Sequence, residues 1–217
     1  MSLRVSVFGM TTCGKRVALW NRFVGKHKRV LVVDSLGEWT DSPVKGPRVD
    51  GIAETLWAIE NQAKKSNEWR IFTCLTEQEI SKLTQVLIPA KAYENSVVRA
   101  LGGCALYLPE VDQQIQPNVY DRVRDLWRRG RHVGLSVYAD TQSISSCSKE
   151  TVKNVDILGM MATTHSTDLK VFEAEIRDPD LFKAATEWAL RPYHASFWFP
   201  KTRVLSRVGP CDPKLLP

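Results

Sequence analysis

Near its N-terminus the chain reads Gly9-Met10-Thr11-Thr12-Cys13-Gly14-Lys15-Arg16. This stretch has the spacing G-x-x-x-x-G-K of a phosphate-binding loop, in which glycines permit tight turns and the lysine reaches the outer phosphates of a nucleotide. It follows an apolar run, Val5 to Phe8, and leads into Lys15 to Phe23, which is expected to form a helix. Backbone amides at a helix N-terminus attract phosphate groups. All eight residues, Gly9 to Arg16, are therefore predicted to bind ATP.

The last residue of this stretch departs from the motif. A Ser or Thr normally stands there, and its hydroxyl holds the magnesium ion that accompanies the nucleotide. Here the residue is Arg16, and a guanidinium has no acceptor atom with which to ligate a metal. The sequence thus predicts nucleotide binding together with an altered metal site.

Length and composition indicate a single soluble α/β domain. The chain has 217 residues, of which 43% are hydrophobic and 25% charged, as is usual for globular proteins. No apolar run approaches the ~20 residues of a membrane span, and the N-terminus lacks the shape of a signal peptide, so the protein is expected to stay where it is made. The five cysteines include no C-x-x-C pair, so no zinc site is expected. The net charge of +6 favours a polyanionic partner.

Expected strands alternate with expected helices along the chain. Strands are predicted over residues 5–8, 29–34, 69–74, 104–108, 133–138 and 155–160, and a final antiparallel pair over 194–199 and 202–208. Helices are predicted over residues 15–23, 52–65, 90–101, 118–129, 166–176 and 178–190, and a further helix of about ten residues starts at a Thr76/Glu79 capping box. Residues 40–49 are predicted to form a surface loop. This alternation is typical of an α/β fold with a mostly parallel sheet, helices on both faces, and the ligand at the carboxyl ends of the strands. Residues 1–208 are predicted to form one P-loop ATPase domain and 209–217 an irregular tail.

The order of these parts resembles the FtsK/HerA branch of RecA-like P-loop ATPases, and within it the genome-packaging ATPases of tailless, membrane-containing viruses. The phosphate-binding loop is the first matching region. The second is Val30 to Trp39, a strand followed by an acidic turn with a glycine, and the third is Arg128 to Gln142, where an arginine is joined to a strand that ends in a glutamine. Lys153 to Asp156 also fits the strand that follows. The resemblance covers roughly residues 3–176.

The resemblance implies roles for four residues. Glu110, at the end of a strand, would polarise the attacking water, and Gln142, at the end of the adjacent strand, would sense the γ-phosphate. An arginine near a subunit interface would stabilise the transition state on the neighbouring subunit's nucleotide. Arg131 is the first choice for this role and Arg129 the second.

A second departure lies where the family has Asp-Glu and this chain has Pro109-Glu110. Together with Arg16 it removes both protein groups that usually support magnesium. Three explanations stay open at this point. Asp112 or Asp34 supplies a carboxylate while phosphates and water hold most of the Mg²⁺; the charge of Arg16 replaces that of the metal; or the nucleotide is bound weakly and hydrolysed little.

The resemblance implies an ATP-driven translocase of double-stranded DNA that packages a viral genome into a preformed capsid. Its partners would be DNA, contacted through backbone phosphates, further copies of the chain in a hexameric or pentameric ring, and a capsid or portal vertex. It would work in the host cytoplasm and associate with the virion. Two alternatives remain: a non-motor P-loop protein with a degenerate metal site, and a small nucleoside or nucleotide kinase, which explains neither the Arg131 to Gln142 region nor the basic helix.

Overall fold

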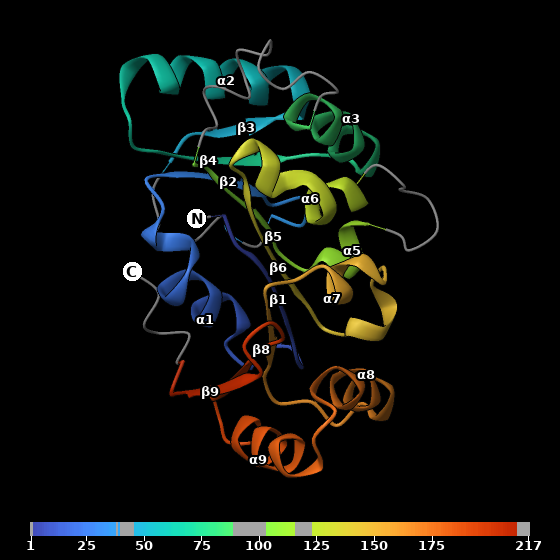
Figure 1. Ribbon diagram of the computed structural model, residues 1–217. Helices are drawn as coiled ribbons and strands as arrows, with labels where there is room; N and C mark the ends of the chain where they lie inside the picture. The colour runs from blue at the N-terminus through green and yellow to red at the C-terminus, as the bar shows by residue number, and fades with distance from the viewer. Residues whose placement is uncertain (1, 38, 40–45, 89–102, 116–122, 212–217) are drawn as a thin grey trace.

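The computed structural model describes residues 2–37, 39, 46–88, 103–115 and 123–211 (Figure 1). Within these residues the chain forms one nine-stranded sheet in the order β3-β4-β2-β5-β6-β1-β7-β8-β9. Its strands are β1 (Arg4–Phe8), β2 (Arg29–Val33), β3 (Arg48–Asp50), β4 (Trp69–Cys74), β5 (Ala105–Leu108), β6 (Ser136–Thr141), β7 (Ile157–Met160), β8 (Ala195–Phe199) and β9 (Val204–Val208). The pairs from β3 through β7 are parallel, whereas β8 pairs antiparallel with both β7 and β9. The mostly parallel sheet and the final antiparallel pair confirm the predicted fold class.

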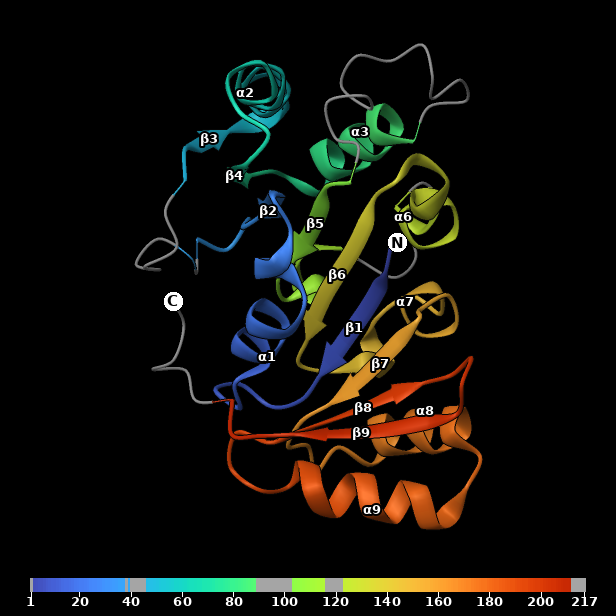
Figure 2. The same cartoon turned by 60° about the vertical axis from the view of Figure 1, so that its left-hand side comes forward.

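Helices cover both faces of the sheet. They are α1 (Lys15–Arg22), α2 (Gly51–Lys65), α3 (Glu77–Leu87), α5 (Val111–Gln114), α6 (Arg124–Arg129), α7 (Glu150–Lys153), α8 (Ser166–Ile176) and α9 (Pro179–Ala189), with 3₁₀ turns η1 (Val24–Lys26), η3 (Gly130–Val133) and η4 (Ile144–Ser146). Figure 2 shows α1 on one side of the sheet and α3, α6 and α8 on the other. Among the described helices, none is long and apolar enough to cross a membrane.

The strand β2 shows why this sheet is buried on both faces. Its Val30 and Val32 belong to the apolar cluster beneath α1, while Leu31 and Val33 belong to the cluster beneath the helices of the other face. A continuous run of β-branched and aliphatic residues is what a central parallel strand requires, because neither of its faces meets water. The same run predicted this strand from the sequence.

Two predicted segments differ from the structure. Residues 40–45 of the loop expected over 40–49 fall outside the described residues, and its last two residues belong to the edge strand β3, which pairs with β4 so that Arg48 lies opposite Phe72. Three residues after Pro47 are too few to show a strand pattern. The strand expected over 133–138 begins at Ser136, because η3 is followed by Gly134, whose φ of 77° is left-handed. It then extends through Thr141.

One further prediction is confirmed, and three others fall on residues that the structure does not describe. The capping box forms as expected, since Thr76 Oγ1 accepts the Glu79 N–H at 3.3 Å and Glu79 Oε2 accepts the Thr76 N–H at 2.9 Å. The helix expected over 90–101, the first part of the one expected from residue 118, and most of the tail fall outside the described residues.

Candidate functional site

The phosphate-binding loop joins the carboxyl end of β1 to the N-terminus of α1. The neighbouring strand ends fix its first residues, because Gly9 N–H donates to Thr141 O at 3.2 Å and Met10 N–H donates to Ala162 O at 2.7 Å. The loop then turns through left-handed backbone at Thr12 (φ 64°) and Gly14 (φ 93°). It reaches α1 in the strand–loop–helix order that a phosphate site requires.

Gly14 shows why a glycine stands at the end of this loop. Its φ of 93° is costly for any residue with a Cβ. A Cβ at this position would also lie 2.3 Å from the carbonyl oxygen of Cys211, which packs against the loop. Both the backbone conformation and the available room therefore require glycine.

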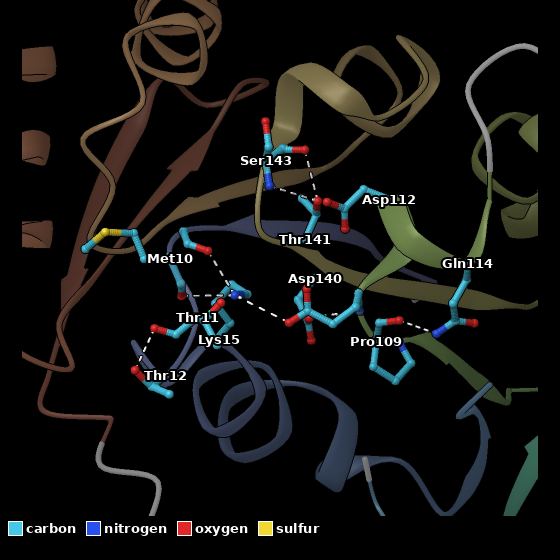
Figure 3. A network of polar contacts seen from close by, with 12 residues as sticks. Met10, Thr11, Thr12, Lys15, Pro109, Asp112, Gln114, Asp140, Thr141 and Ser143 are labelled. Carbon is cyan, nitrogen blue, oxygen red and sulfur yellow. Dashed lines mark hydrogen bonds and ion pairs between the residues drawn. The ribbon is translucent and has the colours of Figure 1, made fainter. Parts of the chain in front are cut away.

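Lys15 places its charge in the middle of the loop. Its side chain is buried, and Nζ donates to the carbonyl oxygens of Gly9 at 2.9 Å and Met10 at 3.1 Å. Nζ also lies 3.6 Å from Glu110 Oε1, which forms an ion pair with it (Figure 3). The structure thus brings together the lysine that the loop motif assigns to phosphate binding and the glutamate to which the resemblance gives water activation.

Glu110 follows β5 and Pro109 in an unusual backbone conformation. Its φ of 45° and ψ of 52° are left-handed, and its N–H donates to Asp140 Oδ1 at 3.0 Å. Burial raises the pKa of the Glu110 carboxyl, and the charge of Asp140 raises it further, against the opposing effect of Lys15. Oε2 is buried and has no hydrogen-bond partner within the described part of the chain. A desolvated carboxylate of this kind is a stronger base than an exposed one.

Asp140 is the residue of this site that sequence reasoning missed. It lies within β6 and is 1% exposed. Besides the Glu110 N–H, it accepts a hydrogen bond from the Tyr107 hydroxyl through Oδ2. Burial, and then the charge of Asp140, raise the pKa of Tyr107 well above its usual range, so the phenol stays a donor. An acid two residues before Gln142 is visible in the sequence, but only the strand register shows what it faces.

The structure brings Gln142 to the loop. Gln142 directly follows β6, and the pairing of Phe8 with Thr141 puts it beside Gly9. Gln142, whose side chain is half-buried, thus lies at the same edge of the sheet as Lys15 and Glu110. The predicted site residues that come from strand ends therefore meet at one edge.

The arginines predicted to act in catalysis do not lie at this edge. Arg129 ends α6 and Arg131 lies in η3, both of which precede the amino end of β6, and both side chains are exposed. Six residues of strand correspond to about 20 Å, so this distance separates them from the loop of the same chain. Arg129 Nη1 lies 3.6 Å from Asp125 Oδ2 in its own helix. A role for either arginine on a neighbouring subunit's nucleotide stays a prediction.

Asp34 and Arg16 lie near the turn after β2. Asp34 Oδ2 accepts the Trp39 N–H at 2.8 Å and lies 3.9 Å from Arg48 Nη1. Burial raises the pKa of Asp34, opposed by the Trp39 N–H and by the charges of Arg16 and Arg48. The Arg16 guanidinium carbon lies 5.4 Å from the centroid of the Trp39 ring. Asp34 and Arg16 therefore both contact Trp39 in the turn after β2.

Asp112, the other acid predicted to support a metal, is the second residue of α5. Its Oδ2 accepts a hydrogen bond from the Ser146 hydroxyl at 3.5 Å, and its Oδ1 is buried with no hydrogen-bond partner among the described residues. The described residues contain no group of three or more His, Cys, Asp or Glu side chains that could hold a metal on their own. Magnesium tolerates such a site, because nucleotide phosphates and water supply most of its ligands. The buried, unpaired Glu110 Oε2 beside Lys15 fits an ion bound in this way.

No protein-family model matches the chain, and no curated protein sequence does. Its fold matches solved structures. The genome packaging NTPase B204 of Sulfolobus turreted icosahedral virus 2, in complex with ATP-γS, has a TM-score of 0.71 and 14% identity over 97% of this chain and 98% of that one. B204, the DNA-packaging ATPase of Sulfolobus turreted icosahedral virus, has 0.66 and 14% over 96% and 97%.

A bacterial conjugative coupling protein, TrwBΔN70, matches with a TM-score of 0.54 and 12% identity over 94% of this chain and 83% of that one. At such identities the likeness establishes the fold. The structural neighbours are of the kind that the sequence resemblance predicted, and the chain has the fold of the P-loop NTPases.

Proposed function

We propose that the chain is an ATPase that drives double-stranded DNA into a preformed viral capsid. The observation that carries this proposal is the buried ion pair of Lys15 and Glu110 in the phosphate-binding loop, with Gln142 at the same edge of the sheet. Those three residues are the parts that positioning and activating an attacking water require. The fold match to a genome packaging NTPase and to a DNA-packaging ATPase supports the choice of DNA packaging.

Each residue has a distinct task in this proposal. The loop amides and Lys15 bind the β- and γ-phosphates, and Glu110 accepts a proton from the attacking water. Gln142 contacts the γ-phosphate through its amide. A magnesium ion bound with ATP is held mainly by phosphates and water, and its charge offsets the negative charge of the phosphates.

The proposed motor is a homo-oligomeric ring, a hexamer or a pentamer, at a capsid or portal vertex. Arg131, or else Arg129, reaches the nucleotide of the next subunit, because both are exposed at the opposite edge of the sheet from their own loop. The net charge of +6 suits contacts with DNA phosphates that are independent of sequence. We place the protein in the host cytoplasm and, during packaging, at the virion.

Displacement of a triplex-forming oligonucleotide from a DNA duplex tests this proposal, because only a protein that moves along duplex DNA removes the third strand. We expect displacement that needs ATP and is lost in Lys15→Ala. Lys28→Ala is the matched control, since Lys28 is exposed and pairs with Glu68 at 3.1 Å far from the loop. ATP-independent displacement, or displacement by Lys15→Ala at the wild-type rate, would contradict the proposal.

A second candidate function is a non-motor protein that binds the nucleotide without efficient hydrolysis. Arg16 and Pro109 favour it, because they stand where a hydroxyl and a carboxylate normally support the metal. Restoring both residues with Arg16→Ser and Pro109→Asp separates the two candidates. A large gain in ATP hydrolysis supports a degenerate site, whereas a loss shows that the altered site is the working one.

A further inference from the structure

The strand register puts Asp140 beside the position where the acid is missing. Leu108, the last residue of β5, lies opposite Ala139 of β6, so the same register extended by one residue brings Pro109 beside Asp140. On its other side β6 pairs with β1, where Asp140 lies opposite Val7, two residues before the phosphate-binding loop. Asp140 therefore stands between Pro109 and the strand that carries the loop.

The side chain of Asp140 also lies on the relevant face of the sheet. Residues two apart in a strand share a face, so a side chain at position 109 points to the same side as Tyr107. Tyr107 belongs to the apolar cluster beneath α1, the helix that follows the loop. Since the Tyr107 hydroxyl donates to Asp140 Oδ2, the Asp140 carboxylate is on this side too. Figure 3 shows Lys15, Asp140 and Pro109 along one end of the sheet.

We propose that Asp140 supplies, from the neighbouring strand, the carboxylate toward the magnesium–nucleotide complex that Pro109 cannot supply. This inference rests on the proposed ATPase function. Each oxygen of Asp140 accepts one hydrogen bond, from Tyr107 or from the Glu110 N–H. A carboxylate has about four lone-pair sites, so each oxygen keeps one for a water of the metal. The Glu110 hydrogen bond also makes Asp140 a positioning residue for the left-handed backbone of Glu110.

The observations favour Asp140 over the two other acids near the site. Of the three acids, Asp140 is the one that accepts the Glu110 N–H, whereas Asp34 accepts the Trp39 N–H and lies near Arg48, and Asp112 accepts a hydrogen bond from Ser146 in η4. The register of β2 with β5 also brings Asp34 beside the position of Pro109, but β2 lies on the far side of β5 from β1, the strand that carries the loop. Asp140 instead lies on β6, between β5 and β1. The unpaired, buried Oε2 of Glu110 lies on the residue that Asp140 holds, which makes these two carboxylates neighbours at the loop.

The test measures metal binding directly, by electron paramagnetic resonance of Mn²⁺ titrated into the protein saturated with a non-hydrolysable ATP analogue. We expect Asp140→Asn to weaken Mn²⁺ binding by about tenfold or more, while affinity for the analogue in excess EDTA stays within about twofold of wild type. The variant Asp140→Asn/Pro109→Asp returns a carboxylate to the neighbouring strand and is expected to recover most of the lost affinity. Asp125→Asn, on the surface of α6, is the control.

The arms of this experiment separate two kinds of failure. Wild-type Mn²⁺ affinity in Asp140→Asn, or a loss found in Asp112→Asn or Asp34→Asn instead, overturns the inference and leaves the ATPase proposal standing. A wild-type protein that binds no ATP analogue with or without metal overturns both. Asparagine keeps the acceptor for Glu110 N–H and can donate to the Tyr107 oxygen, so the variant is expected to fold; the double variant supplies a second test at the same position.

Discussion

At the scale of single residues, the proposed chemistry depends on a carboxylate held where it is costly to hold one. Glu110 is buried, its backbone is left-handed, and Lys15 is its ion-pair partner at 3.6 Å. Strained backbone and a desolvated charge persist only when the surrounding structure enforces them, and they occur most often at functional sites. The hydrogen bond from Glu110 N–H to Asp140 is one part of that enforcement.

Replacing Glu110 by Gln is expected to separate binding from hydrolysis. The amide keeps the shape of the side chain but cannot accept a proton from water, so the single-turnover rate of ATP hydrolysis should fall by about 10²- to 10⁴-fold. Nucleotide affinity, measured by isothermal titration calorimetry, should stay within about tenfold of wild type. Glu173→Gln on the exposed face of α8 is the control. A hydrolysis rate close to wild type would remove Glu110 from the mechanism.

At the scale of elements, one ion-pair network joins strands that are distant in sequence. Arg4 of β1 contacts the Asp156 carboxylate through Nε and Nη2, both at 3.0 Å, and its Nη1 donates to Trp127 O of α6 at 2.7 Å. Lys201, in the turn between β8 and β9, also bonds Asp156. Burial acts to raise the pKa of Asp156, but the hydrogen bonds from Arg4 and Lys201 outweigh it and lower that pKa to about 2.

This network predicts a pH dependence of stability. Because the folded-state pKa lies below the ordinary value of 3.8, the stabilisation is present above pH 3.8 and is lost as the pH falls toward 2. Asp156→Asn should lower the free energy of unfolding by about 1–2 kcal/mol at pH 7, the partly exposed Lys201 limiting the effect. Urea unfolding at pH 7, 4 and 2.5 should show this difference shrinking with acidity. A difference that is constant over this range would contradict the assignment. Asp125→Asn, which removes a partly exposed ion pair with Arg129 in α6, is the control.

The elements also show what the sequence could and could not predict. The run Val30 to Val33 and the Thr76/Glu79 capping box carry local signals, and both formed as expected. Strand β3 forms because it pairs with β4, and β6 begins at Ser136 because Gly134 adopts a left-handed turn. Neither feature can be predicted from the local sequence pattern.

For the site, the loop motif predicted Lys15 and the family resemblance predicted Glu110 and Gln142, and the structure brings all three to one edge of the sheet. Asp140 was missed because its proposed role depends on its position beside Pro109, which directly follows another strand, β5. The sequence showed that two residues that usually support the metal are absent. Which residue replaces them depends on how β5 and β6 pair, and this pairing cannot be predicted from a single segment of the sequence.

At the scale of the whole molecule, the parallel sheet separates two sets of charged residues. The phosphate-binding loop follows the carboxyl end of β1, while Arg131 precedes the amino end of β6. An arginine placed in this way is too far from its own nucleotide to act on it, but it is exposed to a neighbouring subunit. In a ring, each site would then be completed by the next copy of the chain.

Mixing two inactive variants tests that arrangement. Lys15→Ala lacks phosphate binding but keeps Arg131, and Arg131→Ala lacks the arginine but keeps its own loop. If Arg131 acts between subunits, mixed rings contain interfaces with both residues intact, and ATP hydrolysis should rise well above the sum of the two separate variants. Activity that remains additive would place Arg131 outside the neighbouring site, and the same mixture with Arg129→Ala would test the second choice.

The measurement that tests the central claim most directly is steady-state ATP hydrolysis by the wild-type protein and by Lys15→Ala, with and without long double-stranded DNA and with and without Mg²⁺. We predict turnover that requires the metal, rises when duplex DNA is added, falls with added salt as phosphate contacts weaken, and is absent in Lys15→Ala. Bound nucleotide with no turnover under any of these conditions would contradict the proposed motor function and favour a protein that binds nucleotide without hydrolysing it.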